Sequence, residues 1–390
     1  MMINIAFLGY GTVGKGAYKI INEKKSEIEY FVGDEVTVKK ILRRNINVTT
    51  EDGRAIFTSD FNEIVDDEDI SLIVEMTGDL KSSYEYIKRA LENKKHVISA
   101  NKAVVSEYFD EFNKLADKNG VSFLYEAAVG GSIPIITPLK SQAIINKINR
   151  VRGILNGTSN YLLSRMYNEG KSYSEVLKDA QELGYAESDP YDDVEGVDTL
   201  RKLTILSTIA FNGIVKNEDI LRFGISKIND TDIEYLKSKN LKVKLMAESV
   251  LESEAFSAVV EPVVLDERDN LYNIEGADNS VEIFGENYSS LVFKGEGAGS
   301  LPTGNAIVSD VIDVLRGAAL KVKTDESLIC SNKIDAKYYV RVPKDFSLDV
   351  EVESEEVIGE YKVFKTENVS RETLIEKLNC EDYFMARYEI

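Results

Sequence analysis

The sequence predicts an α/β fold in which a parallel-sheet domain precedes an α+β domain and a small C-terminal module. Between residues 3 and 125, short apolar runs rich in β-branched residues alternate with helical patterns, as in parallel sheets. Beyond residue 212, runs such as Leu241–Ser249 and Phe256–Val264 are typical of strands. We place the domains at residues 1–130 with a returning helix at about 300–320, at 131–300, and at 330–390.

Composition limits the classes of partner. A chain of 390 residues is long enough for two or three domains, and its net charge of −20 disfavours nucleic acid and anionic membranes. The N-terminus lacks the pattern of a signal peptide, and no apolar run approaches the ~20 residues of a membrane span. We therefore expect a cytoplasmic protein. Cys330 and Cys380 lack zinc-ligand spacing and occur too late to supply a catalytic thiol.

A glycine-rich motif follows the first apolar run. Residues 3–8 predict a strand, Gly9, Gly11 and Gly14 form G-x-G-x-x-G, and a helical pattern continues to Ile21. The three glycines allow a tight turn, close approach of a pyrophosphate, and close packing of helix on strand. The amides at the helix start, which include those of Thr12 and Val13, would bind the phosphates. This context predicts a Rossmann-type dinucleotide-binding domain.

The second predicted strand, Val36–Leu42, ends in Arg43 rather than in an acidic residue. An acidic residue there would bind the adenosine ribose, whereas arginine suits a 2′-phosphate, so the sequence favours NADP. The alternative is an ordinary basic turn, and some enzymes with arginine here also accept NAD.

Polar residues follow the next two predicted strands, Ile70–Met76 and His96–Ala100. Ligands bind beyond the carboxyl ends of parallel strands, which is where Thr77, Gly78 and Lys102 fall. Lys102 is either a functional residue beside the nicotinamide or a surface lysine after a strand. His96, the only histidine, begins a strand among apolar neighbours, and we interpret it as structural.

Two loops follow the strand predicted at Val121–Tyr125. Residues 126–134 combine glycines with a proline and indicate an irregular crossing between domains, followed by a helix at Ile135–Ile145. After a strand at Val151–Leu155, the stretch NGTSNY (residues 156–161) enters a helix. The helix dipole and free amides there favour a substrate carboxylate, although a plain turn with a Thr or Ser cap would look the same.

The most acidic stretch runs from Gly184 to Lys202 and reads GYAESDPYDDVEGVDTLRK. Asp192 and Glu195 predict an N-cap with a capping box, and a helix from about Val194 towards Ala210. On that helix Asp198 and Lys202 share a face that continues as an apolar stripe, which predicts a buried ion pair. A solvated acidic loop is the alternative. Carboxylates under a lysine suit an amino-acid substrate, because they hold its ammonium while the lysine exchanges a proton.

Several stretches together resemble the homoserine dehydrogenase family. The glycine loop, SANK (99–102), EAAVGGSIPI (126–135), NGTSNY, the acidic stretch and GEGAG (295–299) occur in family order between residue 3 and about residue 318. The resemblance implies reversible hydride transfer between NAD(P)H and L-aspartate 4-semialdehyde, giving L-homoserine, in threonine, methionine and isoleucine biosynthesis. It also implies a small-molecule amino-acid substrate and a homodimer.

The resemblance assigns roles to individual residues. Lys202 would exchange the proton with the substrate oxygen, and Lys102 would lie between cofactor and substrate. Thr158, Glu187 and Asp198 would bind substrate, and Asp193 would support its amino group or the lysine. Gly184 would approach the cofactor, and Gly297 is a further cofactor candidate unless its loop serves only packing. A monovalent cation such as Na⁺ would be held by Glu126, Val129, Gly131 and Ile133.

Two rivals and one departure from the family remain. The rivals are a related amino-acid dehydrogenase and a non-catalytic NADP-sensing protein, although a sensor has no need of the proton-transfer residues. The departure is the C-terminal module. It begins like an ACT-type domain at Lys337–Pro343, but the acidic residues 345–361 lack a convincing first helix. The module is either a reduced ACT-like domain or a different cap, and we assign it no effector.

Overall fold

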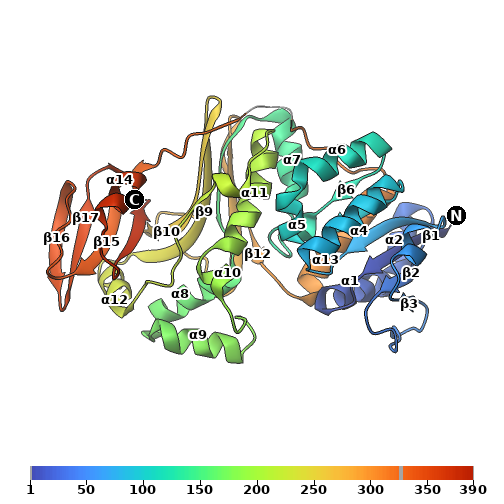
Figure 1. Ribbon diagram of the computed structural model, residues 1–390, viewed down its shortest axis with the longest axis horizontal. Helices are drawn as coiled ribbons and strands as arrows, with labels where there is room; N and C mark the ends of the chain where they lie inside the picture. The colour runs from blue at the N-terminus through green and yellow to red at the C-terminus, as the bar shows by residue number, and fades with distance from the viewer. Residues whose placement is uncertain (1, 325–327, 390) are drawn as a thin grey trace. The chain divides into compact units, whose positions relative to one another are not determined.

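The computed structural model describes residues 2–324 and 328–389, which form two compact units (Figure 1). The first unit comprises residues 2–146, 208–216 and 295–324. The second comprises residues 147–207, 217–294 and 328–389, so the C-terminal module belongs to it.

The first unit is built on a parallel sheet, as predicted. Its six described strands lie in the order β3-β2-β1-β4-β5-β6, and every neighbouring pair is parallel. The strands are β1 (Met2–Leu8), β2 (Glu35–Leu42), β3 (Ile56–Thr58), β4 (Ile70–Glu75), β5 (His96–Ser99) and β6 (Phe123–Leu124). Strands β2 and β3 are added on one side of β1, and β4, β5 and β6 are added on the other side. The carboxyl ends of β1 and β4 therefore flank the crevice in which such folds bind ligands.

Helices cover both faces of this sheet. Helices α1 (Thr12–Glu23), α2 (Lys25–Val32) and α13 (Ser300–Leu315) share one hydrophobic core with the strands, in which Phe7 and Ile307 are fully buried. Right-handed crossovers place α4 (Leu80–Glu92) and α6 (Phe109–Asn119) on the other face. The unit also contains α3 (Asn62–Val65), α5 (Lys102–Glu107), the 3₁₀ turn η1 (Glu126–Ala128) and α7 (Ile136–Ile145).

The predicted returning helix, α13, packs tightly on α1. A Cβ on Gly16 would lie 2.1 Å from the carbonyl oxygen of Ser300, and one on Gly304 would lie 2.7 Å from the amide nitrogen of Ala17. The hydroxyl of Ser300 also donates to the carbonyl oxygen of Thr12 at 2.7 Å. The absence of side chains at these glycines therefore lets a segment 280 or so residues away support the glycine loop.

The second unit is built on a mixed sheet of eleven described strands. Its main path is β12-β11-β7-β9-β10-β19-β15-β17-β16, with β8 and β13 pairing with β10 off the path. The strands on the main path are β7 (Ile148–Ile154), β9 (Lys242–Glu252), β10 (Ala255–Leu265), β11 (Asp278–Gly285), β12 (Tyr288–Glu296), β15 (Tyr338–Pro343), β16 (Val352–Ile358), β17 (Tyr361–Thr366) and β19 (Phe384–Tyr388). The short strands are β8 (Leu221–Arg222), β13 (Ile329–Cys330) and the separate pair β14 (Asp335–Ala336) and β18 (Val369–Ser370).

The helices of this unit are α8 (Gly157–Glu169), α9 (Tyr173–Glu182), α10 (Tyr191–Val194), α12 (Asp230–Ser238) and α14 (Arg371–Lys377), with the 3₁₀ turn η2 (Asn217–Asp219). Helix α11 (Val197–Phe211) begins in this unit and ends in the first. Strand β11 and helix α12 lie beyond residue 212, in the predicted α+β domain, and neither was among the individual elements that we predicted.

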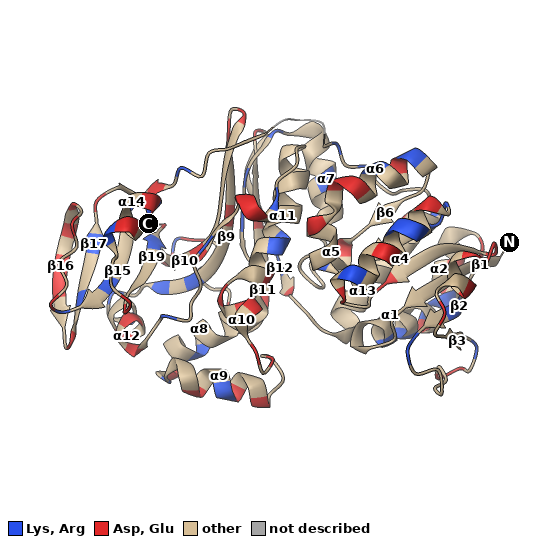
Figure 2. Ribbon diagram, in the orientation of Figure 1, with Lys and Arg blue, Asp and Glu red and all other residues tan. Residues whose placement is uncertain are grey.

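In the C-terminal module, β15 is followed by β16 with no helix between them among the described residues. The acidic stretch for which we predicted no element contains β16, whose side chains are almost all exposed. Figure 2 shows its acidic residues at the edge of the sheet. Charged side chains on an edge strand discourage pairing with another chain, which explains a strand that lacks an apolar pattern.

Buried ion pairs attach this module to the central strands. Arg387 of β19 contacts Glu248 of β9 and lies 2.9 Å from Glu261 of β10. Glu261 also pairs with Arg371 of α14 at 3.0 Å. Since breaking one partner of a buried pair is costly, these contacts fix the module on the sheet.

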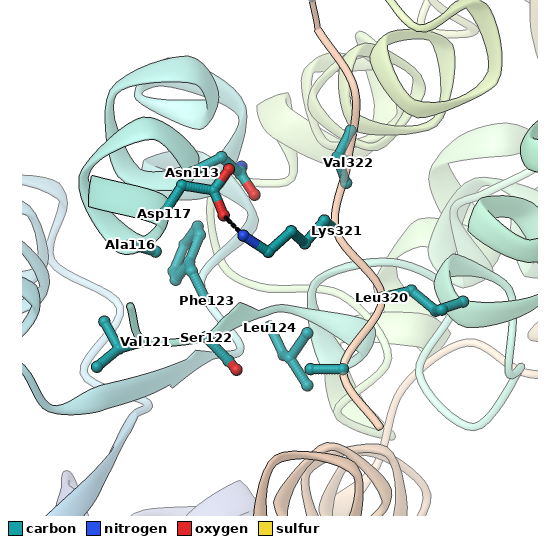
Figure 3. Close-up of a pocket in the computed structure, with 11 residues that line it drawn as sticks. Asn113, Ala116, Asp117, Val121, Ser122, Phe123, Leu124, Leu320, Lys321 and Val322 are labelled. Atoms are coloured by element: carbon teal, nitrogen blue, oxygen red, sulfur yellow. Dashed lines mark ion pairs between the residues drawn. The ribbon is translucent and has the colours of Figure 1, made fainter. Parts of the chain in front are cut away.

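The segment after α13 crosses a small hollow beside α6 in the first unit (Figure 3). Lys321 and Asp117 form an ion pair of 2.6 Å across it. Its volume of about 60 Å³ has room for water but not for a substrate. Within the described residues, helices long and apolar enough to cross a membrane are absent.

Candidate active site

The glycine loop of the first unit has the predicted geometry. Gly9 has φ +103°, and a Cβ on it would lie 2.9 Å from the carbonyl oxygen of Met76. A Cβ on Gly14 would lie 2.8 Å from the carbonyl oxygen of Gly9. Around Gly11, by contrast, the space that a Cβ would occupy is open to 4 Å. Two glycines therefore form the turn and its packing, and the third leaves room for a ligand.

The same loop presents a helix N-terminus without a side-chain cap. Gly11 is the N-cap residue of α1, and its carbonyl oxygen accepts a helical hydrogen bond from the amide of Lys15 at 3.0 Å. The amides of Thr12, Val13 and Gly14 precede that bond and are oriented along the helix axis. This arrangement fits the pyrophosphate of a dinucleotide. At the end of β2, the Arg43 amide donates to Thr58 at 2.8 Å, which fixes where this side chain leaves the sheet.

A buried carboxylate organises the carboxyl ends of β4 and β5. Glu75 is fully buried and accepts hydrogen bonds from the Thr77 amide (2.7 Å) and hydroxyl (2.6 Å), from Ser83 (2.8 Å) and from Ser99 (2.7 Å). Sequence reasoning selected Thr77 but missed Glu75. An acidic residue that ends an apolar strand, followed by threonine, was the available signal.

This network extends to Lys102. The side-chain nitrogen of Asn101 donates to the hydroxyl of Ser83 at 3.0 Å, and its side-chain oxygen accepts from the backbone amide of Ala103 at 3.1 Å. Asn101 therefore caps α5, of which Lys102 is the first residue. Gly78, with φ +80°, lies at the neighbouring strand end. The predicted residues Thr77, Gly78 and Lys102 thus belong to one polar edge of the sheet.

The loop after β6 closes around Glu126. This buried carboxylate accepts the amides of Ile135 (2.6 Å), Ile136 (2.7 Å) and Thr137 (2.8 Å), which begin α7. In the described part of the chain, the carbonyl oxygens of Val129, Gly131 and Ile133 accept no backbone hydrogen bond. One carboxylate with open carbonyl oxygens is a donor set that fits a monovalent cation. Gly297 lies against this loop, since a Cβ on Gly131 would be 2.5 Å from its carbonyl carbon.

Other buried ionisable groups surround Glu126. The Asp310 carboxylate accepts the Glu126 backbone amide at 2.8 Å, and burial together with the charge of Glu126 raises the pKa of Asp310 well above its usual range. Burial lowers the pKa of Lys140 to about 8, and its ammonium lies 4.5 Å from the centre of the Tyr125 ring. Burial and the nearby carboxylate therefore favour the protonated form of Asp310.

The second unit contains the predicted ion pair of the acidic stretch. Lys202 Nζ lies 2.7 Å from Asp198 Oδ2, and the two side chains are 9% and 6% exposed. The ammonium also donates to the carbonyl oxygen of Leu155 at 2.6 Å, at the end of β7. The interpretation that this pair points inward is confirmed, and the solvated-loop alternative is wrong for it.

Asp193 joins this pair through a neighbour that sequence reasoning did not select. The side-chain nitrogen of Asn156 donates to Asp193 Oδ1 at 2.7 Å and to Asp198 Oδ2 at 3.0 Å. Burial raises the pKa of Asp193, although the hydrogen bond from Asn156 opposes the shift. Thr158, in the first turn of α8, donates its hydroxyl to the carbonyl oxygen of Tyr185 at 2.7 Å.

The predicted capping box of Asp192 and Glu195 is wrong. Asp192 lies within α10 and pairs with Arg201 at 2.8 Å, and Glu195 is the C-cap residue of that helix. The break arises at Gly196, which has φ +76°, so α11 begins at Val197 rather than at Val194. A side chain there would collide with Val260, because its Cβ would lie 2.7 Å from Cγ1.

Glu187 and Gly184 lie outside this cluster. Both are exposed in the segment between α9 and α10, and the backbone carbonyl oxygen of Glu187 accepts from the side-chain nitrogen of Gln181 at 3.1 Å. The structure therefore brings Asp193, Asp198 and Lys202 together and leaves Glu187 facing solvent. His96 is structural, as interpreted, because its Nδ1 accepts the Ser122 amide at 3.0 Å. Groups of three or more His, Cys, Asp or Glu that could hold a metal ion are absent from residues 2–324 and 328–389.

Comparison with known proteins identifies the family. The family model of homoserine dehydrogenase matches residues 134–312, and that of the NAD-binding domain of homoserine dehydrogenase matches residues 9–126. The homoserine dehydrogenase of Bacillus subtilis is 36% identical over 322 residues, which are 82% of this chain and 74% of that protein. The chain belongs to the homoserine dehydrogenase family. A Synechocystis homoserine dehydrogenase is 39% identical over 323 residues, covering 81% of this chain and 74% of its own length.

Solved structures of homoserine dehydrogenases share the fold. A crystal structure from Thiobacillus denitrificans has a TM-score of 0.90 at 31% identity and covers 100% of this chain and 98% of its own. A hyperthermophilic archaeal homoserine dehydrogenase in complex with NADPH has a TM-score of 0.69 at 26% identity, covering 80% and 98%. The protein is thus an oxidoreductase that interconverts L-homoserine and L-aspartate 4-semialdehyde with a nicotinamide cofactor, as predicted. The rival sensor and the related dehydrogenase are not favoured.

Proposed function

We propose that the second unit binds homoserine beside the Lys202–Asp198 pair and that Lys202 exchanges the proton with the substrate hydroxyl. The supporting observation is the cluster itself: one ammonium and two carboxylates, mostly buried, tied together by Asn156. The carboxylates of Asp193 and Asp198 would bind the substrate ammonium, with Thr158 as a further contact. Glu187, which faces solvent outside this cluster, would contact the substrate only after its segment turns towards it. Burying such charges is costly unless they serve binding or chemistry, and this favours a functional role.

Lys202 is oriented for proton transfer by two contacts. In reduction of the semialdehyde, its ammonium donates a proton to the oxygen on which negative charge develops. Asp198 and the Leu155 carbonyl hold the ammonium in position during this transfer. Lys102, fixed as the first residue of α5, stabilises the developing charge electrostatically. The nicotinamide supplies the hydride in this direction and accepts it in the other.

In the first unit, we propose that Gly9, Gly11, Thr12, Val13 and Gly14 bind the cofactor pyrophosphate, with Thr77 and Gly78 near the nicotinamide. Arg43 favours NADP over NAD by pairing with a 2′-phosphate, and NADPH in the archaeal relative supports this choice. Gly184 and Gly297 are further cofactor contacts.

The remaining assignments concern the whole protein. Glu126, with the carbonyls of Val129, Gly131 and Ile133, would bind Na⁺ or a similar cation. We further propose a cytoplasmic homodimer in which residues 1–130 with 300–320 bind the cofactor and residues 131–300 bind substrate and mediate dimer contact. Residues 330–390 would form a reduced ACT-like module.

The test follows absorbance of the reduced cofactor while L-homoserine is oxidised, with NADP and NAD in parallel and L-serine and L-threonine as controls. Lys202→Met should lower kcat by about 10²- to 10⁴-fold while leaving cofactor affinity unchanged. Lys244→Met is the matched control, because Lys244 is also buried but donates to Asn160 (3.0 Å) and Ile274 (2.6 Å). Turnover by Lys202→Met at the wild-type rate would refute the proton-transfer role.

A further inference from the structure

Asn156 occupies a singular position in the second unit. It is 4% exposed and stands between β7, which ends at Ile154, and α8, which begins at Gly157. Its side-chain nitrogen has two hydrogens, and these are directed to Asp193 (2.7 Å) and Asp198 (3.0 Å). Its side-chain oxygen accepts the amide of Ser159 at 2.8 Å and so caps α8.

Helix capping accounts for only half of these contacts. Asp, Ser and Asn are nearly equivalent as N-caps, because each offers an oxygen to the amides of the first turn. Of these three residues, only Asn can present an NH₂ group as well, and here that group joins carboxylates from two helices, α10 and α11. The residue type is therefore determined by the carboxylate pair and not by the cap.

The carboxylate pair requires such a donor. Two neighbouring carboxylates in a buried site repel each other and tend to share a proton, which would leave one of them unable to attract a cation. Consistent with this, burial and the nearby charge of Asp198 raise the pKa of Asp193, and the hydrogen bond from Asn156 acts in the opposite direction. The charged groups that face this pair are each other and Lys202, and the hydroxyl of Thr158 also favours the ionised form of Asp193.

We propose that Asn156 is a positioning residue that holds Asp193 and Asp198 side by side as two ionised carboxylates directed at the substrate ammonium. It does not touch the reacting atoms. This inference rests on the proposed function, in which these two residues bind the ammonium and Lys202 carries the proton. It extends that function to a specificity device, because two fixed carboxylates select substrates with a protonated amino group.

Asn156→Asp is the decisive variant, because it keeps the oxygen that caps α8 and replaces the NH₂ donor with an acceptor. Three adjoining carboxyls would then share at least one proton near neutral pH. We expect the low-pH limb of the kcat/KM profile for L-homoserine to move up by about one pH unit, and KM at pH 7 to rise about tenfold or more. Cofactor affinity, measured from the change in fluorescence of NADPH itself on binding, should change less than about twofold.

Asn160→Asp is the matched control for loss of a buried amide. Asn160 lies one turn further along α8, is 1% exposed, and donates to the carbonyls of Ile274 (3.2 Å) and Asp278 (3.1 Å) instead. Asn160 Oδ1 also accepts from the Lys244 ammonium at 3.0 Å, so Asn160→Asp keeps a charged partner for its new carboxylate and should leave the low-pH limb in place. If Asn156→Asp does not fold, Asn156→Ser decides, because a hydroxyl keeps the cap but can donate to only one carboxylate. It should give a smaller shift in the same direction.

The proposal is overturned if Asn156→Asp, or Asn156→Ser in its place, has the same low-pH limb of the kcat/KM profile and the same KM for L-homoserine as the wild type. It is also overturned if Asn160→Asp moves the limb equally, since the effect would then be structural. These results are distinguishable from failure of the proposed function. If the proposed function is wrong, the wild-type enzyme fails to oxidise L-homoserine or Lys202→Met remains active, and the role proposed for Asn156 is then wrong as well.

Discussion

Replacing one partner of the Lys202–Asp198 pair should lower the free energy of unfolding by an amount that follows from the distance between the two charges. At 2.7 Å and an effective dielectric constant of about 20, two unit charges attract by roughly 6 kcal/mol. Desolvation offsets part of this, and removing one partner of a buried pair typically costs about 3–5 kcal/mol. Asp198→Asn should lie near the lower value, about 3 kcal/mol, because the Leu155 carbonyl still accepts from the stranded ammonium.

The assay is a double-mutant cycle of Asp198→Asn, Lys202→Met and the double variant, in which thermal and urea unfolding measure the stability of each protein. For a unit of 150–250 residues, a loss of 3 kcal/mol lowers Tm by roughly 6–12 °C. Lys202→Met should cost less, about 2 kcal/mol, because Asp198 keeps its hydrogen bond from Asn156. The double variant should be less destabilised than the sum by about 2 kcal/mol. Additivity within about 0.5 kcal/mol would show that the two charges do not stabilise each other, and the reasoning would be refuted.

Three further predictions concern the first unit. Arg43→Asp should raise KM for NADP about tenfold or more with little effect on NAD, because a charge-assisted bond to the 2′-phosphate is lost; equal effects in a steady-state comparison of the two cofactors would contradict this. Burial alone would raise the pKa of Asp67, but hydrogen bonds from Lys40 and Lys39 lower it to about 2. The stability that Asp67 contributes, about 1–2 kcal/mol, is therefore present above pH ~4 and lost towards pH 2. Urea unfolding should show that the wild type and Asp67→Asn differ in free energy of unfolding at neutral pH, and that this difference disappears between pH ~4 and pH ~2. Glu126→Gln should abolish any rise in Tm that Na⁺ gives relative to a bulky organic cation. The substitution should also lower the free energy of unfolding by about 2 kcal/mol, because one of the three backbone amides that bond this carboxylate loses its acceptor. A wild-type Tm that does not respond to Na⁺ would exclude the cation site.

Four strands of the first unit and its glycine loop could be predicted from sequence because their signals are local, whereas β3, α2 and α6 were not among the predicted elements. Strands β1, β2, β4 and β5 lie within one or two residues of their predicted bounds. Buried parallel strands read as continuous apolar runs, and the glycine loop has a fixed spacing. The contact of Gly16 with Ser300 could not be predicted, since it depends on where α13 docks and not on any pattern near either residue.

In the second unit, the misses share a physical cause. Strand β16 pairs with β17 through its backbone while its side chains stay exposed, so no alternation of apolar residues records it. The capping box failed because Gly196 turns the chain where Val260 approaches it, a contact made across the sheet. Sequence patterns indicate which face of an element is buried. They do not predict an element that is held by backbone hydrogen bonds alone or a turn that depends on contact with a distant strand.

The same limit separates the ion pair from the residue that organises it. Asp198 and Lys202 lie four residues apart on one helix, so their contact follows from helical geometry and the apolar stripe beside them. Asn156 lies 42 positions before Asp198, and its own neighbourhood in the sequence signals only a helix cap. A residue that serves two functions shows in the sequence only the local one. Buried polar side chains that cap a helix, and whose remaining hydrogen-bonding capacity has no local use, are therefore where undetected members of an active site should be sought.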